Sequence, residues 1–277
     1  PKKAETAIIA ALADETVGLE GGFAITYKPA RFETAFLRDS VRLFFEQALI
    51  TDILAQVKGG KEASVYRCVG HPTMDAPLLA ANVYRPRQFR NLSNDAAYRE
   101  GRQVLKDDGR PVKASDHRIQ RALNKKSNYG VQVAHTSWLM YEFKTLERLH
   151  AAGAAVPKPY ATSENAILMA YIGDEQRAAP TLQESALTPE EAPRLFAEVM
   201  RNIDLMLQQG WIHGDLSAYN ILYWQGTLTL IDFPQVVNVA NNSHAQQVLE
   251  RDIVRVCQYF ATQGVQSKPE QITRELW

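Results

Sequence analysis

Three polar residues in the C-terminal half of the sequence have types and spacings that suit phosphoryl transfer. Asp215 follows a histidine and a glycine, Asn220 lies five residues further on, and Asp232 follows an apolar run. Phosphoryl transfer requires an acceptor for the proton of the nucleophile and oxygen ligands for the Mg²⁺ ions that accompany a nucleoside triphosphate. Asp215 suits the first task, whereas Asn220 and Asp232 suit the second. Each residue alone is typical of an ordinary turn, but the combination beside apolar segments predicts a catalytic site.

Two short predicted strands position these three residues. The apolar segments 221–224 and 228–231 are joined by a Gln-Gly turn, so that Asn220 precedes the first strand and Asp232 follows the second. The preceding helix is expected to begin at a capping box that starts with Thr188 and to end at Gly210. A last amphipathic helix is predicted from apolar residues at helical spacing. These residues are Leu249, Ile253, Val256 and Phe260.

The N-terminal half is predicted to contain an antiparallel sheet and two helices. Four short β-branched or apolar runs, separated by turn residues, favour strands. They are residues 53–57, 64–69, 78–84 and 166–171. Helices are predicted over 32–48 and over 137–152, where the second ends at Gly153. The residues expected on the buried face of that second helix are Leu139, Phe143, Leu146 and His150. A sheet followed by a mostly helical half favours two lobes.

The composition is that of a globular protein with a substantial apolar core. The chain has 277 residues, 45% of them apolar, with 31 basic and 31 acidic side chains. These figures exclude intrinsic disorder, and two cysteines outside any CxxC pattern exclude a disulfide framework and a zinc knuckle. So few cysteines predict a reducing, cytoplasmic location. The most apolar runs are far shorter than the ~20 residues that span a bilayer, so no membrane association is expected.

The formal net charge of zero conceals a basic segment. Residues 84–129 contain 12 Lys and Arg against 5 Asp and Glu, a net charge of +7. The rest of the chain has 19 basic and 26 acidic residues, a net charge of −7. Such a segment can attract RNA phosphate, an acidic protein or a nucleotide. The alternative is a solvated loop, since the segment has few aromatic residues on which bases could stack.

Three motifs together resemble the RIO family of atypical serine/threonine protein kinases. They are Gly60-Lys61-Glu62-Ala63-Ser64-Val65-Tyr66, His213-Gly214-Asp215-Leu216-Ser217 with Tyr219-Asn220, and Ile231-Asp232-Phe233-Pro234-Gln235. The resemblance covers about residues 50–262. It implies a bilobal α+β protein-kinase-like fold, with an antiparallel sheet and one helix in the N-lobe and a mostly helical C-lobe. The expected boundaries are an N-terminal helical extension over 1–49, an N-lobe over 50–170 with a basic flexible insertion at 85–130, and a C-lobe over 171–277.

The resemblance also implies roles for individual residues. Asp215 is then the catalytic aspartate, and Asn220 and Asp232 hold Mg²⁺ or Mn²⁺ with the phosphates of ATP. Residues 58–64 form the loop that covers the phosphates, and the end of the fourth strand forms the hinge that binds adenine. Asp252 and His213 are expected to support the catalytic loop. The residues implied in nucleotide binding are Lys58, Gly59, Gly60, Lys61, Glu62, Ser64, Asn82, Glu142, Met169, Ala170 and Ile172.

Asn82 departs from the family pattern. It stands where a kinase strand has the lysine that binds phosphate and pairs with the glutamate matched here by Glu142. Asparagine is short and neutral, and by analogy the loss of one positioned donor costs roughly 3 kcal/mol of transition-state stabilisation. Three explanations are open: an introduced substitution, a degenerate nucleotide-binding protein, or a lysine supplied from elsewhere. Lys58 and Lys61 are the candidates for such a lysine.

The function implied by the resemblance is ATP-dependent phosphoryl transfer of the RIO type. It would proceed through serine autophosphorylation, or through an ATPase switch with a phospho-aspartate at Asp232. A protein substrate is expected. RNA or a ribosomal particle is a further expected partner through 85–130, because RIO proteins of archaea and eukaryotes act in small-subunit ribosome maturation.

Two alternative functions stay open. A nucleotide-binding pseudokinase scaffold is favoured by Asn82 and opposed by the intact set of Asp215, Asn220 and Asp232. A small-molecule kinase of the aminoglycoside type is opposed by the 45 residues that follow Asp232, which leave little room for a substrate-binding insert.

Overall fold

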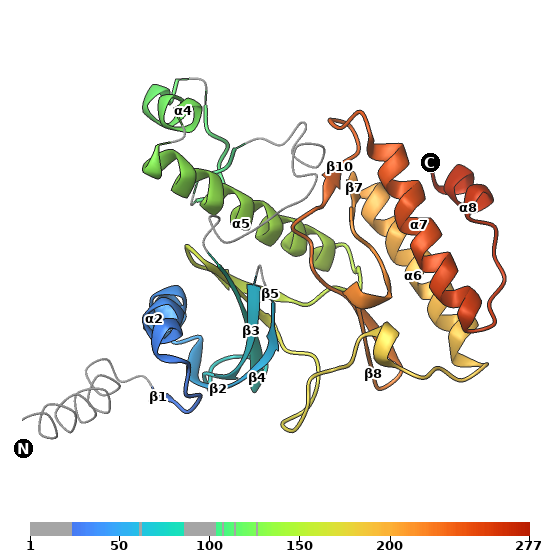
Figure 1. Cartoon of the computed structure of the whole chain (residues 1–277), viewed down its shortest axis with the longest axis horizontal. Coiled ribbons are helices and arrows are strands. Elements are labelled where there is room, and N and C mark those ends of the chain that lie inside the picture. Colours follow the sequence, from blue (N-terminus) through green and yellow to red (C-terminus); the bar gives the residue numbers. More distant parts are fainter. Residues whose placement is uncertain (1–23, 61–62, 86–103, 107, 114, 126) are drawn as a thin grey trace, which may run out of the picture.

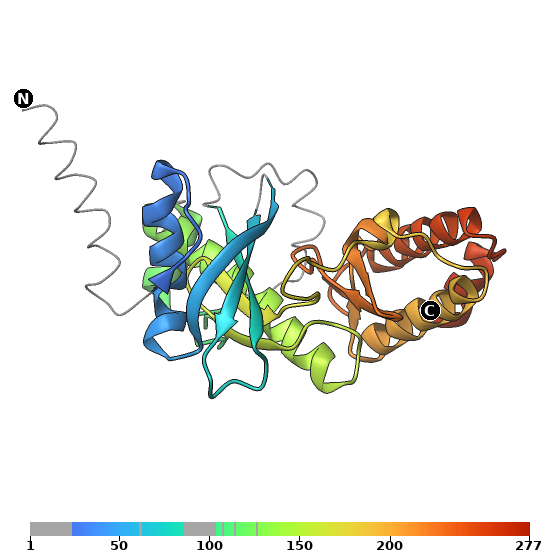
Figure 2. The same cartoon turned by 90° about the horizontal axis from the view of Figure 1, so that it is seen from below.

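The computed structural model describes residues 24–60, 63–85, 104–106, 108–113, 115–125 and 127–277. They form two lobes, one built on a β-sheet and one mostly helical (Figure 1, Figure 2). The bilobal α+β fold expected from the sequence is therefore confirmed. Residues 1–23, Lys61, Glu62 and 86–103 of the basic insertion lie outside the described residues.

The sheet of the N-terminal lobe has six strands in the order β1-β2-β3-β4-β6-β5. Their bounds are β1 Ala24–Ile25, β2 Ile50–Gly59, β3 Ala63–Gly70, β4 Leu78–Tyr84, β5 Pro159–Thr162 and β6 Ala166–Ala170. β1 is parallel to β2, and all other neighbours are antiparallel. The four predicted strands are confirmed. β5 was not predicted, and it can begin at Pro159 because it is an edge strand.

Helix α2 (Arg31–Glu46) covers one face of this sheet, and it matches the helix predicted over 32–48. Its buried residues Leu37, Val41 and Phe44 share an apolar core with strand residues such as Ala81 and Val83 of β4. Because side chains alternate along a strand, residue 82 between these two must face the opposite side of the sheet. The α2 core thereby fixes which β4 side chains face the other lobe.

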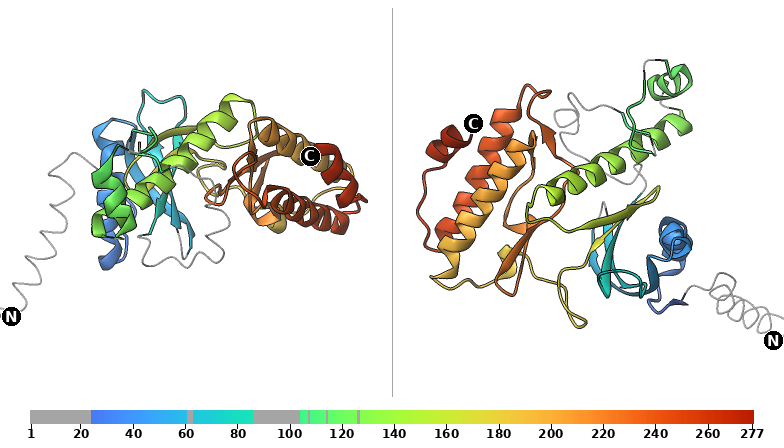
Figure 3. Two further views of the ribbon diagram at one scale, coloured as in Figure 1. Left: turned by 90° about the horizontal axis from the view of Figure 1, so that it is seen from above. Right: turned by 180° about the vertical axis from the view of Figure 1, so that it is seen from behind.

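Helix α5 (Asn128–Ala151) packs against the opposite face of the sheet and extends to the second lobe (Figure 3). The ring of Tyr141 on α5 lies 5.2 Å from that of Trp211 in the C-terminal lobe. The helix begins nine residues earlier than predicted, where Ser127 Oγ accepts a hydrogen bond from Gly130 N–H. In this first stretch, residues 128–136, the larger apolar residues fall at every second position rather than at helical spacing. The placement of His150 in the core was wrong: His150 is exposed, and the 3.6-residue period brings Leu149 inward instead.

The C-terminal lobe contains a short hairpin and three helices. The helices are α6 (Glu191–Gln208), α7 (Ala245–Thr262) and α8 (Pro269–Leu276), with the short 3₁₀ helices η2 (Leu182–Glu184) and η3 (Ala218–Asn220). β8 (Ile221–Trp224) and β9 (Thr227–Leu230) form the predicted hairpin. β7 (Trp211–Ile212) pairs with β10 (Val237–Asn238), and neither was predicted because two-residue strands leave no periodic signal.

The capping box predicted at the start of α6 is present. Glu191 N–H donates to Thr188 Oγ1 at 3.2 Å, and Thr188 N–H donates to Glu191 Oε2 at 2.9 Å. α6 and α7 contribute to the apolar core that also includes α5 and the β8–β9 hairpin. Along the described ranges, no helix combines the length and apolarity that crossing a bilayer requires.

Helix α4 (His117–Asn124) packs across the N-terminal end of α5, remote from the C-terminal lobe (Figure 1, Figure 3). The two helices approach closely at Gly130, where an added Cβ would lie 2.1 Å from the carbonyl oxygen of Ala122. Only glycine allows this approach. The helical part of the basic segment, residues 117–129, is therefore held on a helical hairpin.

Candidate active site

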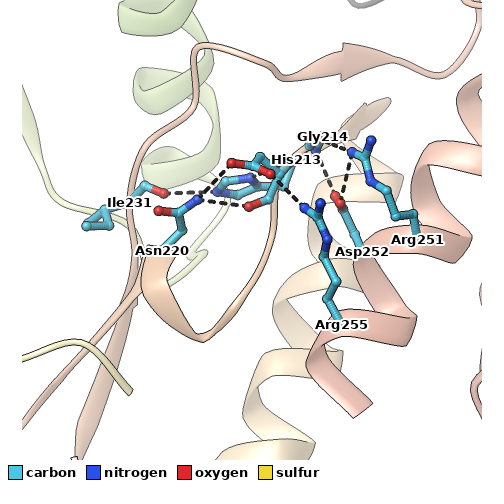
Figure 4. Close-up of polar contacts among 8 residues, drawn as sticks. His213, Gly214, Asn220, Ile231, Arg251, Asp252 and Arg255 are labelled. Atoms are coloured by element: carbon cyan, nitrogen blue, oxygen red, sulfur yellow. Dashed lines mark hydrogen bonds and ion pairs between the residues drawn. The ribbon is translucent and has the colours of Figure 1, made fainter. Parts of the chain in front are cut away.

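The loop between β7 and β8 is built around a buried histidine (Figure 4). His213 Nε2 lies 3.0 Å from the carbonyl oxygen of Ile231, and His213 Nδ1 lies 3.3 Å from the backbone nitrogen of Asp215. Because a carbonyl oxygen accepts and an N–H donates, Nε2 carries the proton and Nδ1 accepts. Burial lowers the pKa of His213 to about 4, which keeps the imidazole in this neutral form at neutral pH. His213 therefore supports the loop, as expected, rather than acting as a base.

Gly214 is held between α7 and the segment that follows β9. Its N–H donates to Asp252 Oδ2 at 2.8 Å, and its carbonyl oxygen accepts a hydrogen bond from Arg251. Its φ is +86°, and an added Cβ would lie 2.1 Å from the carbonyl oxygen of Gln235. Only glycine suits both the left-handed backbone and the close approach. Asp252 supports the loop as expected, and Gly214 fixes the direction in which the chain enters Asp215.

The carboxyl group of Asp252 is desolvated in making this contact. Asp252 is 1% exposed, and Arg251 Nη2 lies 3.4 Å from its Oδ1. Burial raises the pKa of Asp252 to about 7, although Arg251 and the Gly214 N–H favour the charged form. The carboxyl group that holds the loop thus has a strongly raised pKa.

The carboxylate of Asp215 is contacted on both of its oxygens. Arg255 Nη1 lies 2.6 Å from Oδ1, and Asn220 Nδ2 lies 3.4 Å from Oδ2. The same nitrogen of Asn220 donates to the backbone carbonyl oxygen of Asp215 at 2.8 Å. The loop from Asp215 to Asn220 is therefore closed by its own end residue, and the carboxylate at its start is oriented from α7.

Asn220 also connects the loop to Asp232. The backbone carbonyl oxygen of Asn220 accepts a hydrogen bond from Ile231 N–H at 3.0 Å. Ile231 is thus held through its nitrogen by Asn220 and through its oxygen by His213. Asp232 itself is exposed and has a φ of +71°, an uncommon backbone conformation for a residue with a side chain. The structure thus brings Asp215, Asn220 and Asp232 to one end of the β8–β9 hairpin.

Asn220 and Asp232 fit a magnesium ion that is shared with phosphate groups. Among the residues that the structure describes, no group of three or more His, Cys, Asp or Glu side chains could hold a metal. Mg²⁺ is ordinarily held by one or two protein oxygens, completed by water and phosphate. Because Asn220 Nδ2 donates to Asp215, Asn220 Oδ1 is the atom that would ligate the metal, together with the carboxylate of Asp232.

Asn82 on β4 is connected to Glu142 on α5 through a tyrosine. Asn82 Nδ2 donates to the hydroxyl of Tyr84 at 2.6 Å, and that hydroxyl donates to Glu142 Oε1 at 2.7 Å. Glu142 is 2% exposed. Asn82 Oδ1 is buried and has no hydrogen-bond partner within the described part of the chain. The connection between residue 82 and Glu142 is therefore indirect, and the intervening Tyr84 was not identified from the sequence.

The three residues expected at the hinge lie at the end of β6 and just after it. Met169 is half-buried and pairs with Ala80 in register. Ala170 N–H donates to the carbonyl oxygen of Lys158 at 2.8 Å, and the carbonyl oxygen of Ile172 accepts from Ala179 N–H at 2.9 Å. These two backbone groups hold the hinge itself. Adenine would have to use the carbonyl group of Ala170 and the N–H of Ile172.

The turn between β2 and β3 contains the residues expected to cover phosphate. Lys58 is exposed, and Gly60 N–H donates to the carbonyl oxygen of Ala63 at 2.9 Å. Ser64 Oγ accepts from Gln56 Nε2 at 3.1 Å and shares its strand face with residues of the α2 core, so its side chain faces away from the other lobe. Only the backbone of Ser64 can then take part in phosphate binding. Lys61 and Glu62 lie outside the described residues, and Gly59 pairs with Ser64 in register.

Sequence reasoning missed two arginines that contact the catalytic loop. Arg251 and Arg255 lie one residue before and three residues after Asp252 on α7. Residues three or four apart share a helix face, so the spacing from Asp252 was a usable signal for Arg255. For Tyr84 the sequence held no comparable signal.

Comparisons with known sequences identify the family that this chain resembles. The RIO domain family matches residues 96–272. The RIO-type serine/threonine-protein kinase Rio1 of Haloferax volcanii is 32% identical over 209 residues, which cover 75% of this chain and 63% of that protein. The serine/threonine-protein kinases RIO1 of Chaetomium thermophilum and Homo sapiens are 29% and 27% identical, covering 78% and 79% of this chain but 41% and 35% of their own lengths. This chain thus spans less than two thirds of these relatives.

A solved structure shares the fold. The Rio2 kinase–ADP/Mg²⁺–phosphoaspartate complex from Chaetomium thermophilum matches with a TM-score of 0.59 and 17% sequence identity, over 95% of this chain and 74% of that chain. The family match begins after β4, so it includes the hinge, the catalytic loop and α7 but not Asn82.

Replacing Gly214 by alanine tests the close approach at the loop. We expect Gly214→Ala to lower the free energy of unfolding by more than Gly226→Ala does, measured by urea denaturation. Both glycines have positive φ, +86° and +80°, so both substitutions carry the same backbone cost of roughly 1–2 kcal/mol. At Gly226 the nearest atom to an added Cβ is 3.9 Å away, whereas at Gly214 it is the Gln235 carbonyl oxygen. Equal losses in the two variants would contradict the close approach.

The neutral state of His213 predicts a pH dependence of stability. The pKa of His213 is about 4 in the folded chain and about 6.5 when unfolded, so below pH 6.5 only the unfolded chain takes up the proton. The contribution of His213 to the free energy of unfolding should therefore fall by about 3 kcal/mol as the pH drops from 6.5 to 4. His213→Gln, which does not titrate, should lack this component in urea titrations at each pH. Parallel decreases in both proteins would show that His213 is protonated normally.

Proposed function

The chain belongs to the RIO family, and from that premise we propose that it transfers the γ-phosphoryl group of ATP in a reaction that requires Mg²⁺ or Mn²⁺. The observation that carries the proposal is the closed set of contacts around the catalytic loop. Asp215 and Asn220 are hydrogen-bonded to each other, and Asn220 is hydrogen-bonded to the residue that precedes Asp232. A proton acceptor and two metal ligands are thereby fixed relative to one another, which is what phosphoryl transfer needs.

In the proposed reaction Asp215 accepts the proton of a serine hydroxyl. The hydroxyl oxygen bonds to the γ-phosphorus, the bond from that phosphorus to the bridging oxygen breaks, and ADP leaves. Asn220 Oδ1 and the carboxylate of Asp232 would hold the metal ion, which when bound would neutralise part of the phosphate charge. The serine can belong to this chain, as in autophosphorylation, or to a protein substrate.

A variant of this reaction uses Asp232 as the nucleophile. A carboxylate oxygen of Asp232 would bond to the γ-phosphorus while the bond from that phosphorus to the bridging oxygen breaks and ADP leaves. Water would then hydrolyse the acyl phosphate to inorganic phosphate and the free carboxylate, so that the chain acts as an ATPase switch. Its exposed position and unusual φ of +71° support this role. The Rio2 structure with the same fold is described as a phosphoaspartate complex.

Nucleotide binding is proposed to use the face of the sheet that lies opposite α2. Adenine would contact Met169 and the backbone of Ala170 and Ile172, and the β2–β3 turn would cover the phosphates. Asn82 cannot supply positive charge there. We propose that Lys58 supplies part of it, because Lys58 is exposed at the end of β2. It also lies close enough to Glu184 of the other lobe to help lower the pKa of that carboxyl, after the larger contribution of hydrogen bonds from Thr181.

A pseudokinase scaffold is the second candidate, and Asn82 is the observation that favours it. The hydrogen-bonded series from Asn82 through Tyr84 to Glu142 occupies the place of a lysine–glutamate pair without a positive charge. Such a chain would bind nucleotide and a partner but release no product. A location in the cytoplasm suits either candidate, and the free, buried Cys68 and Cys257 are compatible with it.

A basic surface on the α4–α5 hairpin is proposed to bind RNA, or the RNA of a ribosomal particle. Arg118, Arg121 and Lys125 are exposed on and just after α4. The guanidinium of Arg118 lies 5.3 Å from the ring centre of Tyr129, whose side chain is 43% exposed. Cations that attract phosphate beside an exposed aromatic ring that can stack on a base are the usual elements of a single-stranded RNA site.

The proposed chemistry is tested by incubating the full chain with γ-labelled ATP and Mg²⁺. Asp215→Asn should lower phosphoryl transfer at least 100-fold, because a positioned general base contributes about 10²–10⁴-fold. Asp39→Asn, an exposed aspartate on α2, serves as the control and should leave transfer unchanged. Hydroxylamine separates the two routes: it removes label from an Asp232 acyl phosphate but not from serine.

The same assay decides between a kinase and a pseudokinase. Nucleotide binding without turnover in the wild type and in Asn82→Lys would favour the scaffold. Lys58→Ala should lower turnover if Lys58 supplies the missing charge, and it should have less effect in the Asn82→Lys background. Unchanged turnover in Lys58→Ala alone would eliminate the proposed role of Lys58.

The RNA surface is tested by reversing three charges, Arg118→Glu, Arg121→Glu and Lys125→Glu, in one variant. Its affinity for a fluorescent single-stranded RNA, measured by anisotropy at several salt concentrations, should fall at least tenfold. The slope of log affinity against log salt should decrease by about 2, because each phosphate that is no longer neutralised removes about 0.7 from it. A control with the same change in net charge replaces the exposed Arg201, Lys268 and Arg274 by glutamate. Equal effects of the two variants would contradict a site on α4.

A further inference from the structure

One face of α7 contacts two consecutive residues of the catalytic loop. Arg251 and Asp252 bind the carbonyl oxygen and the N–H of Gly214, and Arg255, one turn later, reaches the side chain of Asp215 (Figure 4). The first two contacts hold the backbone. Of these three contacts, only that of Arg255 reaches a side chain, and it is the side chain of Asp215, which accepts a proton in the proposed reaction.

The geometry makes Arg255 the main restraint on the carboxylate of Asp215. Arg255 Nη1 lies 2.6 Å from Oδ1, the distance of a strong charge-assisted hydrogen bond. The contact on the other oxygen, from Asn220 Nδ2 to Oδ2, is 3.4 Å long and therefore weak. The amide of Asn220 is used mainly for the backbone carbonyl oxygen of Asp215, at 2.8 Å. Without Arg255, the two side-chain torsions of Asp215 would be only loosely fixed.

The exposure of the pair argues against a purely structural role. The side chains of Arg255 and Asp215 are 40% and 38% exposed, so water screens their attraction. Ion pairs of this kind contribute little to folding stability. Asp252, by contrast, is 1% exposed and belongs to the interior. An ion pair that adds little stability can nevertheless fix one rotamer of a side chain whose direction matters.

We propose that Arg255 is a positioning residue of the active site. Its guanidinium holds Oδ1 of Asp215, and this orients Oδ2 towards the hydroxyl that gives up its proton. Arg255 does not contact the nucleotide in this role and changes no bond. The proposal rests on the proposed function, since it assigns Arg255 a part in that same transfer step. A misplacement of a reacting group by about 1 Å can cost on the order of 100-fold in rate, so loss of this restraint should be measurable.

The test compares Arg255→Gln, Arg255→Lys and the control Arg274→Gln, an exposed arginine on α8, by steady-state kinetics of phosphoryl transfer in the full chain. Arg255→Gln should lower kcat about 10- to 100-fold and leave KM for ATP within about twofold. Arg255→Lys should recover most of the loss, because the single contact at 2.6 Å needs one charged donor. All three variants should unfold at the temperature of the wild type.

The outcomes separate this proposal from the proposed function. If Asp215→Asn abolishes transfer while Arg255→Gln retains the wild-type kcat, the role of Arg255 is refuted and the function stands. A rise in KM for ATP without a loss in kcat would assign Arg255 to nucleotide binding and would equally overturn the positioning role. If Arg255→Lys is as slow as Arg255→Gln, the ion pair is not what matters. If the wild type and Asp215→Asn are equally inactive, the proposed function fails, and the role of Arg255 fails with it.

Discussion

The backbone N–H and carbonyl groups of Gly214 are both hydrogen-bonded to side chains of α7, and the rest of the site depends on this attachment. Asp252 accepts its N–H, and Arg251 donates to its carbonyl oxygen. The residues on either side are thereby placed: His213 supports the strand that leads to Asp232, and Asp215 meets Arg255 and Asn220. Because Asn220 also binds Ile231, the contacts form a closed set. Displacing one of these residues would disturb the others.

This arrangement contains several locally unfavourable features. Asp252 is buried with a pKa raised to about 7, and His213 is buried as a neutral imidazole with a pKa of about 4. Gly214 and Asp232 both adopt positive φ, which is costly for the aspartate. Such features persist only where the surroundings over-determine them. Here the surroundings are the apolar core of α5, α6, α7 and the β8–β9 hairpin, in which Phe233 and Ile253 are fully buried. Strained and perturbed groups gathered at one place are typical of functional sites.

The sequence predicted those parts of the molecule that leave a periodic or a local signal. The β-branched or apolar runs of β2, β3, β4 and β6 and the capping box at Thr188 were visible, and so was the spacing from Asp215 to Asn220. Elements of two residues, such as β7, left no period, and the apolar residues in the first turns of α5 do not follow helical spacing. The prediction for His150 was wrong because it placed the next buried residue four positions after Leu146. The helix instead buries Leu149, three positions after Leu146. Contacts between distant segments were least predictable: the spacing from Asp252 was a signal for Arg255, but no local pattern places Tyr84 between Asn82 and Glu142.

The two lobes differ in how closely they follow the expected chemistry. The C-terminal lobe contains the proposed proton acceptor and the two proposed metal ligands, whereas the N-terminal lobe presents the neutral Asn82 and its bond to Tyr84. The central claim is that Asp215, Asn220 and Asp232 together form the site of transfer. A crystal structure of the chain with Mg²⁺ and a non-hydrolysable ATP analogue tests it most directly. We predict a metal ion bound by Asn220 Oδ1 and the Asp232 carboxylate, with the γ-phosphate facing Asp215. A nucleotide bound with its metal away from these two residues, or with its γ-phosphate turned from Asp215, would contradict it.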